Sequence, residues 1–180
     1  GKQIQGGTLM FKNTIFRRMT ALVLTLALAA AAALPGLAVY PMPIQTASET
    51  EAVYLFNADT GKTILNQNAG QQQYVASLTK LMTALLLLES GKDLNGEVTV
   101  PTALTQEFRD IQNANGTTIG LRIGETVRRI DLLNAMLIVS ANDAASVIAY
   151  DVGGSVLDFV KQMNARAQEL GCTGTNFTCA

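Results

Sequence analysis

The 180-residue sequence predicts an α+β fold, in which a β-hairpin precedes a mainly helical region. Two observations lead to this class. The β-prone runs AVYLF (52–56) and TILN (63–66) flank NADTGK, whose Asn, Asp and Gly residues favour a turn. Further along, apolar residues recur at helical spacing. Because two strands alone cannot cover both faces of a sheet or close its edges, the hairpin should require partner strands that this sequence does not clearly contain.

The segment YVASLTKLMTALLLLESG (74–91) predicts a helix that begins near Ser77 and ends at Gly91, since glycine suits the position after a helix. Its leucines cover more than one face, which indicates the most buried helix of the protein. EVTV (97–100) predicts a short strand. Residues 105–120 are polar and rich in Asn and Gly towards their end, which predicts mostly loop.

The last third of the sequence predicts three helical segments. The chain is extended at first and becomes helical near Ile130, with a core stripe of Leu132, Leu133, Met136 and Leu137. The tripeptide SAN (140–142) interrupts this helix, and a second segment follows at 143–150. Residues 155–170 form the most amphipathic helix, which a Ser155–Asp158 capping box begins and Gly171 ends. Its predicted core face consists of Val156, Phe159, Val160, Met163 and Leu170.

Composition excludes several function classes. The formal net charge is −1, so there is no basic excess with which to bind nucleic acid. The sequence contains no histidine, which excludes histidine metal sites, Ser-His-Asp triads and Cys-His dyads from this chain. Asp59, Asp131 and Asp143 are interpreted as turn and cap residues rather than as a paired-carboxylate site. Cys172 and Cys179 could pair in an oxidising compartment, and the sequence leaves that open.

The N-terminal region is typical of a secretory signal peptide. Basic residues precede an apolar run at 19–34, and small residues at Gly36 and Ala38 suit cleavage after Ala38. The alternative is an uncleaved membrane helix, although the run is shorter than the roughly 20 residues that span a bilayer. We therefore divide the chain into upstream residues (1–9), a signal peptide (10–38), a linker (39–50) and a partial catalytic domain (51–180).

Ser77 and Lys80 are three residues apart on the first predicted helix, which places them on one face. A serine hydroxyl needs a base to become a nucleophile, and a lysine shielded from water can supply a neutral amine. The positive end of the helix would also stabilise an oxyanion. The alternatives are a plain N-cap serine and a solvated surface lysine, and by itself the motif is weak, because roughly 0.2 such pairs are expected by chance.

Ser140 and Asn142 form a second candidate pair. In the functional interpretation, Ser140 passes a proton between the lysine and the leaving group, and Asn142 hydrogen-bonds a substrate amide. The alternative is a polar turn between two helices in which either residue caps the second helix.

Ser-x-x-Lys followed by Ser-x-Asn is the ordered signature of the penicillin-recognising serine acyltransferases. The stretches ASLTKLMTALLLLESG, LRIGETVRRIDLLNAMLIVSANDAA and FVKQMNARAQELG resemble the low-molecular-mass D-alanyl-D-alanine carboxypeptidases, a family of penicillin-binding proteins. NADTGKTILNQN resembles the opening hairpin of that family. The resemblance extends from about Val53 to the end of the sequence.

The resemblance implies a penicillin-binding-protein or β-lactamase-like fold, with a helical cluster against an antiparallel sheet that is incomplete here. It implies a penicillin-sensitive serine carboxypeptidase that removes the terminal D-alanine from peptidoglycan stem peptides. Ser77 would be acylated, Lys80 would be the base, Ser140 would complete proton transfer and Asn142 would position the substrate. No metal or cofactor is expected.

The resemblance also implies partners and a location. The expected partners are peptidoglycan stem peptides and β-lactam antibiotics, outside the cytoplasmic membrane in the periplasm, the cell wall or the outer side of the membrane. Membrane association would come from an uncleaved signal or from a C-terminal anchor beyond residue 180. The family's third motif, Lys-Thr-Gly, which grips the substrate carboxylate, is absent from these 180 residues. We therefore expect the sequence to be the N-terminal part of a longer protein.

Two alternative functions stay open at this point. A β-lactamase or a D,D-endopeptidase of the same superfamily would carry the same signature, and turnover of penicillin and of peptides would separate them. A non-catalytic exported fragment that binds the cell wall is the second, because a site without the carboxylate grip would stabilise a transition state poorly.

Overall fold

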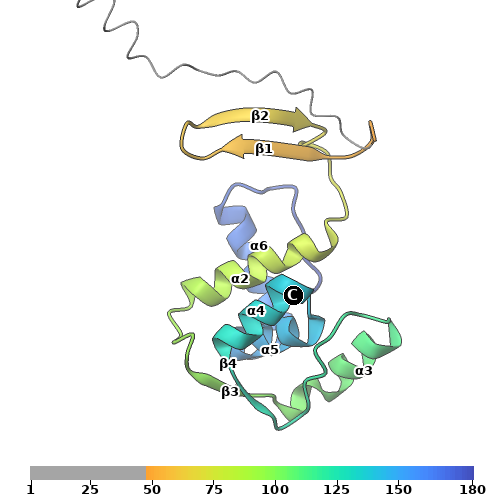
Figure 1. Cartoon of the computed structure of the whole chain (residues 1–180), viewed down its shortest axis with the longest axis vertical. Coiled ribbons are helices and arrows are strands. Elements are labelled where there is room, and N and C mark those ends of the chain that lie inside the picture. Colours follow the sequence, from red (N-terminus) through yellow and green to blue (C-terminus); the bar gives the residue numbers. More distant parts are fainter. Residues whose placement is uncertain (1–47) are drawn as a thin grey trace, which may run out of the picture. The chain divides into compact units, whose positions relative to one another are not determined.

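The computed structural model describes residues 48–180, so the predicted signal peptide and most of the linker lie outside the described residues. The division of the chain into four parts therefore stays a prediction. The described elements, in chain order, are β1 (Val53–Asn57), β2 (Lys62–Gln67), the 3-10 turn η1 (Ala76–Leu78), α2 (Thr79–Glu89), β3 (Glu97–Thr99), the 3-10 turn η2 (Thr102–Leu104), α3 (Thr105–Asn113), β4 (Thr126–Arg128), α4 (Arg129–Val139), α5 (Asn142–Gly153) and α6 (Val156–Glu169) (Figure 1). The α+β class is confirmed.

The predicted hairpin is present as the antiparallel pair of β1 and β2. Its turn is closed by the Asn57 side chain, which accepts a hydrogen bond from the Thr60 backbone N–H at 2.9 Å, and by Gly61, whose φ of 67° suits a residue without a Cβ. The rings of Tyr54 and Phe56 stack with centroids 6.3 Å apart, yet both side chains are about half exposed. The hairpin therefore leaves its aromatic residues largely in contact with solvent.

A second two-stranded sheet pairs β3 with β4 in antiparallel register, with Val98 opposite Val127. The strand at 97–100 and the extended start of the following segment were both predicted, and both are confirmed. Their pairing could not be predicted, because each strand has only three residues and 26 residues separate them. This sheet leads the chain directly into α4.

Helix α3 corrects the prediction that residues 105–120 are mostly loop. Residues 105–113 are helical, and Phe108 packs against the core on one side of an otherwise polar helix. The turn residues that suggested a loop begin only at the helix end, where Asn115 has a φ of 52°. The error arose because polar helix formers on an exposed face were counted together with the loop that follows them.

Helix α2 is less buried than its leucine-rich sequence predicts. Its buried residues are Lys80, Thr83, Ala84 and Leu87. Leu78, Leu81 and Leu88 are all more than half exposed. The most buried helix is instead α5, in which every residue from Asp143 to Ala149 is buried. Alanines at three of these positions let α2, α3, α4 and α6 approach α5 closely, so α5 forms the centre of the helical cluster (Figure 1).

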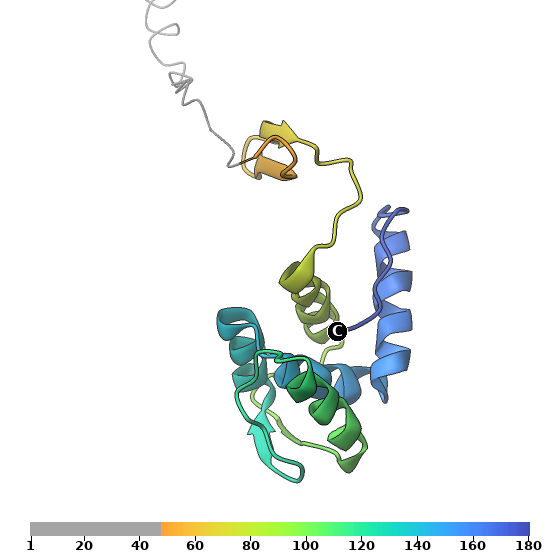
Figure 2. The ribbon, with the colours of Figure 1, turned by 90° about the vertical axis from the view of Figure 1, so that its right-hand side faces the viewer.

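Two smaller predictions of core positions were wrong. Leu137 on α4 and Leu170 after α6 are each about half exposed, whereas their neighbours Leu132, Met136, Phe159 and Met163 are buried as predicted. The capping box of α6 is confirmed, since the Ser155 hydroxyl accepts the Asp158 backbone N–H at 3.0 Å. After α6 the chain doubles back beside that helix (Figure 2). Ala180 then packs against both parts of the apolar core.

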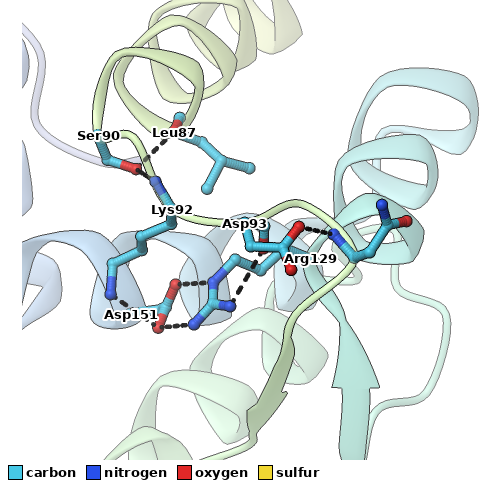
Figure 3. A network of polar contacts seen from close by, with 7 residues as sticks. Leu87, Ser90, Lys92, Asp93, Arg129 and Asp151 are labelled. Atoms are coloured by element: carbon cyan, nitrogen blue, oxygen red, sulfur yellow. Dashed lines mark hydrogen bonds and ion pairs between the residues drawn. The ribbon is translucent and has the colours of Figure 1, made fainter.

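A network of charged side chains joins the end of α2, the start of α4 and the end of α5 (Figure 3). Arg129, at the start of α4, donates two hydrogen bonds to the Asp151 carboxylate of α5, at 2.7 and 3.0 Å. Lys92, which follows α2, lies 3.4 Å from the same carboxylate, and Arg129 also donates to the Asp93 backbone carbonyl. Planar, two-pronged pairing of this kind is the strongest geometry for an ion pair.

Within residues 48–180, none of the helices has the length and apolar character needed to cross a membrane. Cys172 and Cys179 are both free and exposed.

We predict that Asp151→Asn lowers the free energy of unfolding by about 2 to 4 kcal/mol, because it leaves the half-buried Arg129 without its counter-ion. Burial alone would raise the pKa of Asp151, but the hydrogen bonds and charges of Arg129 and Lys92 outweigh it and hold the pKa below its ordinary value. The stabilisation is therefore present above pH 3.8 and is lost as the pH falls through the lower folded-state value. Chemical denaturation between pH 2.5 and 7 measures both effects.

Asp131→Asn is the matched control, since Asp131 also pairs with an arginine but both side chains are about half exposed. It should change stability little. Equal losses in the two variants would show that the Asp151 network does not hold the helices together.

Candidate active site

Ser77 lies in the 3-10 turn that leads into α2, and its side chain is exposed. Its Oγ accepts a hydrogen bond from the Ser140 Oγ at 2.7 Å. The plain N-cap alternative is wrong, because Leu78 occupies the cap position of α2 and no side chain caps that helix. The Ser77 hydroxyl is therefore presented to solvent at the positive end of α2.

Lys80 is the second residue of α2, and only 6% of its surface is exposed. Its Nζ donates a hydrogen bond to the Asn142 Oδ1 at 2.7 Å. Burial lowers the pKa of Lys80, and the weaker opposing effect of the nearby Cys179 thiol does not offset it. The alternative of a solvated surface lysine is therefore wrong. A lysine in this environment reaches its neutral, proton-accepting form at lower pH than an exposed one.

Ser140 ends α4 in the left-handed region, with φ 60° and ψ 33°. This backbone turn carries its hydroxyl to Ser77. Ala76, which precedes Ser77, also has a positive φ of 46°. Such conformations cost about 1 to 3 kcal/mol each for residues other than glycine, and they concentrate at functional sites.

Asn142 is the first residue of α5, and three contacts fix its orientation. Its backbone N–H and its Nδ2 both donate to the Thr117 carbonyl, at 2.8 and 3.1 Å, while its Oδ1 accepts from Lys80. The cap position belongs to Ala141, so neither Ser140 nor Asn142 caps α5 through its side chain. One N–H of the Asn142 amide is left for a further partner.

The four predicted residues thus come together as two hydrogen-bonded pairs. Ser77, Lys80 and Ser140 line one cavity of about 310 Å³. The remaining lining residues are all apolar: Val75, Leu78, Leu81, Met136 and Leu137. Within the described part of the chain no hydrogen bond joins Lys80 to Ser77 directly. A proton could therefore leave Ser77 for Lys80 only after a small movement or through an intervening group such as a water or Ser140.

The N-terminus of α2 lies at this cavity, because Ser77 and Lys80 both line it. Lys80 also contacts Asn142, the first residue of α5, so the lysine lies between the starts of two helices. Both helix fields disfavour a protonated lysine, and that of α2 favours a negative charge beside Ser77. The arrangement suits a reaction in which a carbonyl oxygen becomes an oxyanion.

Sequence reasoning missed Asp143, which was interpreted as a cap residue. It is 2% exposed and accepts backbone hydrogen bonds from Ile119 and Leu121. The sequence gives one signal: Asp143 lies in the first turn of an otherwise largely apolar helix, and a carboxylate that is buried there needs hydrogen-bond partners. Among residues 48–180 there is no group of three His, Cys, Asp or Glu side chains that could hold a metal ion.

Comparison with known proteins identifies the family of the chain. The family model of D-alanyl-D-alanine carboxypeptidases, the S11 peptidases, matches residues 40–180. The chain is 34% identical over 136 residues to the Bacillus subtilis D-alanyl-D-alanine carboxypeptidase DacF, covering 74% of this chain and 33% of the relative. It is 33% identical over 136 residues to a Pseudomonas aeruginosa D-alanyl-D-alanine endopeptidase, covering 76% and 42%.

Two solved structures share the fold of this chain. A Streptomyces DD-transpeptidase superposes with a TM-score of 0.63 at 29% identity, covering 70% of this chain and 50% of that one. Penicillin binding protein 5 from Haemophilus influenzae superposes with a TM-score of 0.56 at 31% identity, covering 66% and 35%. The fold class expected from the sequence is confirmed.

The chain spans about a third to two fifths of the length of these two curated relatives. The family model nevertheless matches most of it, from before the hairpin to Ala180, and that span includes the cavity with both serines and the buried lysine. The chain therefore belongs to the D-alanyl-D-alanine carboxypeptidase family of serine peptidases, among the low-molecular-mass penicillin-binding proteins.

Proposed function

We propose that the gene product containing this chain cleaves peptides ending in D-Ala-D-Ala, the stem peptides of peptidoglycan, through an acyl-serine intermediate on Ser77. The observation that carries the proposal is the pair of contacts from Ser140 to Ser77 and from Lys80 to Asn142. Two hydroxyl groups and a buried amine thus share one cavity, which supports the assignment of Ser77 as the nucleophile. Families of serine hydrolases without histidine need such an arrangement to activate the nucleophile.

In the acylation step, the Ser77 Oγ attacks the carbonyl carbon between the two D-alanines. The Ser77 proton passes to the neutral amine of Lys80, and Ser140 relays a proton to the leaving amine as the C–N bond breaks. The positive end of α2 stabilises the oxyanion. The free N–H of Asn142 donates to a carbonyl of the substrate peptide.

In the deacylation step, water attacks the ester of Ser77. The Lys80 amine takes a proton from the water and passes a proton to the Ser77 Oγ as the C–O bond of the ester breaks. This step releases the shortened peptide, and the D-alanine has already left in the acylation step. No metal or cofactor enters either step.

Two features support a carboxypeptidase in particular. The cavity, about 310 Å³, is at the low end of the range for ligand sites, which suits a leaving group as small as D-alanine. A carboxypeptidase also stands among the curated relatives. An endopeptidase is the second candidate, because the Pseudomonas aeruginosa relative of nearly equal identity has that activity in its name.

The location and partners form part of the same proposal. The substrate lies outside the cytoplasmic membrane, and the predicted signal peptide at 10–38 supports export to that side. β-Lactams are expected to acylate Ser77, because the family consists of penicillin-binding proteins.

We predict that Ser77→Ala abolishes covalent labelling of the full gene product by a fluorescent penicillin, since no other side chain supplies the attacking oxygen. Ser140→Ala should label roughly 10²- to 10⁴-fold more slowly, because the proton relay is lost. Gel fluorescence over time measures both. Ser90→Ala, at the opposite end of α2, is the control and should label normally; persistent labelling of the Ser77 variant would refute the assignment of the nucleophile.

The rate of acylation should rise with pH as Lys80 loses its proton, with a midpoint below the ordinary lysine value of 10.5, because burial lowers the pKa of this group. Lys80→Arg keeps the charge and the contact to Asn142 but does not deprotonate, so its acylation should be very slow and should not rise over the same range. Stopped-flow labelling between pH 6 and 10 tests this. Lys161→Arg, an exposed position, should retain the wild-type profile.

Substrate choice provides the next prediction. The purified gene product should release D-alanine from a pentapeptide ending in D-Ala-D-Ala with a higher kcat/KM than it cleaves a cross-linked D,D-peptide dimer, because the cavity suits a small leaving group. Chromatography of both reactions gives the two constants. A preference for the dimer would favour the endopeptidase, and rapid hydrolysis of penicillin without an accumulating acyl-enzyme would favour a β-lactamase.

A further inference from the structure

Asp143 is a buried carboxylate whose partners are all backbone amides. Its oxygens accept hydrogen bonds from Ile119 N at 3.2 Å, from Leu121 N at 3.0 Å and from Ala144 N at 2.9 Å. Within residues 48–180 no Lys or Arg pairs with it. A carboxylate taken out of water needs replacement for its hydration, and here the converging N–H groups and the positive end of α5 provide it.

The segment that Asp143 holds, residues 117–121, has no helix or sheet bonds of its own. Its backbone is tied to the first two residues of α5. Ile119 and Leu121 donate to Asp143, and the Thr117 carbonyl accepts from the backbone and the side chain of Asn142. Leu121 packs against the apolar core, but the other side chains of the segment are exposed, so its position depends largely on these backbone hydrogen bonds.

The Thr117 carbonyl determines which way the Asn142 amide points. Because Nδ2 donates to Thr117, the opposite atom, Oδ1, faces Lys80 and accepts its hydrogen bond. A rotated amide would turn N–H groups towards the lysine and lose both contacts. The orientation of Asn142 therefore depends on where residues 117–121 lie.

Gly116, which directly precedes residues 117–121, lies very close to Asn142. A Cβ at Gly116 would lie 3.0 Å from the Asn142 Nδ2 and 2.9 Å from the Ile111 Cγ2. Both distances are shorter than ordinary van der Waals contact. The position thus accepts only glycine without displacing either neighbour.

We propose that Asp143 is a positioning residue: by holding residues 117–121 through their backbone amides, it makes the Thr117 carbonyl orient Asn142 towards Lys80. This inference rests on the proposed function for its effect on the reaction. It assigns a role in that function to a carboxylate that contacts neither the substrate nor the nucleophile.

Asp143→Asn is the direct test in the full gene product. It replaces one acceptor oxygen by an NH₂ group that faces backbone N–H donors, so residues 117–121 should loosen. We expect acylation by a fluorescent penicillin to slow roughly 10- to 100-fold, the cost of a small misplacement of a catalytic group. If Asp143 acts through Asn142, the double variant with Asn142→Ala should be no slower than Asn142→Ala alone.

A spectroscopic readout separates positioning from a loss of folded protein. In ¹⁵N NMR spectra, the side-chain NH₂ of Asn142 and the backbone amides of Ile119 and Leu121 should be protected from exchange in the wild type, and this protection should fall in Asp143→Asn. Asp151→Asn is the matched control, since it alters another shielded carboxylate of α5 that has no contact with the site. It should lower stability but leave the protection of these groups and the acylation rate unchanged.

Gly116→Ala tests the same geometry if Asp143→Asn does not fold, because its Cβ should displace Asn142 and slow acylation. Gly70→Ala, where a Cβ meets no atom within 4 Å, is its control. Additive losses in the double variant, or unprotected Ile119 and Leu121 amides in the folded wild type, would overturn the proposal. If the wild type is not acylated at all, the proposed function fails, while the exchange measurements still decide whether Asp143 orients Asn142.

Discussion

The hydrogen bond between Lys80 and Asn142 is the contact on which the arrangement of the site depends. Removing an amine from water costs several kcal/mol unless a partner replaces the lost hydration. The Asn142 amide supplies that partner only where the starts of α2 and α5 lie side by side. Burial of the lysine and the approach of the two helix starts are therefore consequences of one packing arrangement.

The same two helices are joined at their other ends by charge. Lys92 follows α2, Asp151 lies near the end of α5, and the two side chains meet beside Arg129 (Figure 3). Side-chain contacts therefore join the two helices both near their starts and near their ends. A displacement of one helix along the other would break both contacts at once. The charged network therefore stabilises the packing of these helices, whereas the contact at their starts orients the residues of the site.

Local sequence signals predicted much of the fold and the members of both hydrogen-bonded pairs of the candidate site. Turn residues at Asn57 and Gly61, the interruption at 140–142 and the cap at Ser155 act within a few residues, so the sequence alone reveals them. The burial of α2 was mispredicted because Leu78 and Leu81 line the cavity instead of filling the core. Asp143 was missed because two of its three partners, Ile119 and Leu121, lie more than 20 residues away in a segment with no regular structure. What the sequence could not reveal is therefore the set of contacts that depend on tertiary packing.

The positive φ of Ser140 indicates most directly that its hydroxyl group is needed for more than the fold. A helix that ends in the left-handed region ordinarily has glycine at that place, because glycine adopts a positive φ without strain. Serine costs about 1 to 2 kcal/mol more there. In this chain the strained turn brings the hydroxyl to 2.7 Å from Ser77, a contact that glycine could not make. Ala76 carries a similar strain immediately before Ser77. Both unfavourable conformations thus hold the same two hydroxyl groups together, and backbone strain of this kind concentrates at functional sites.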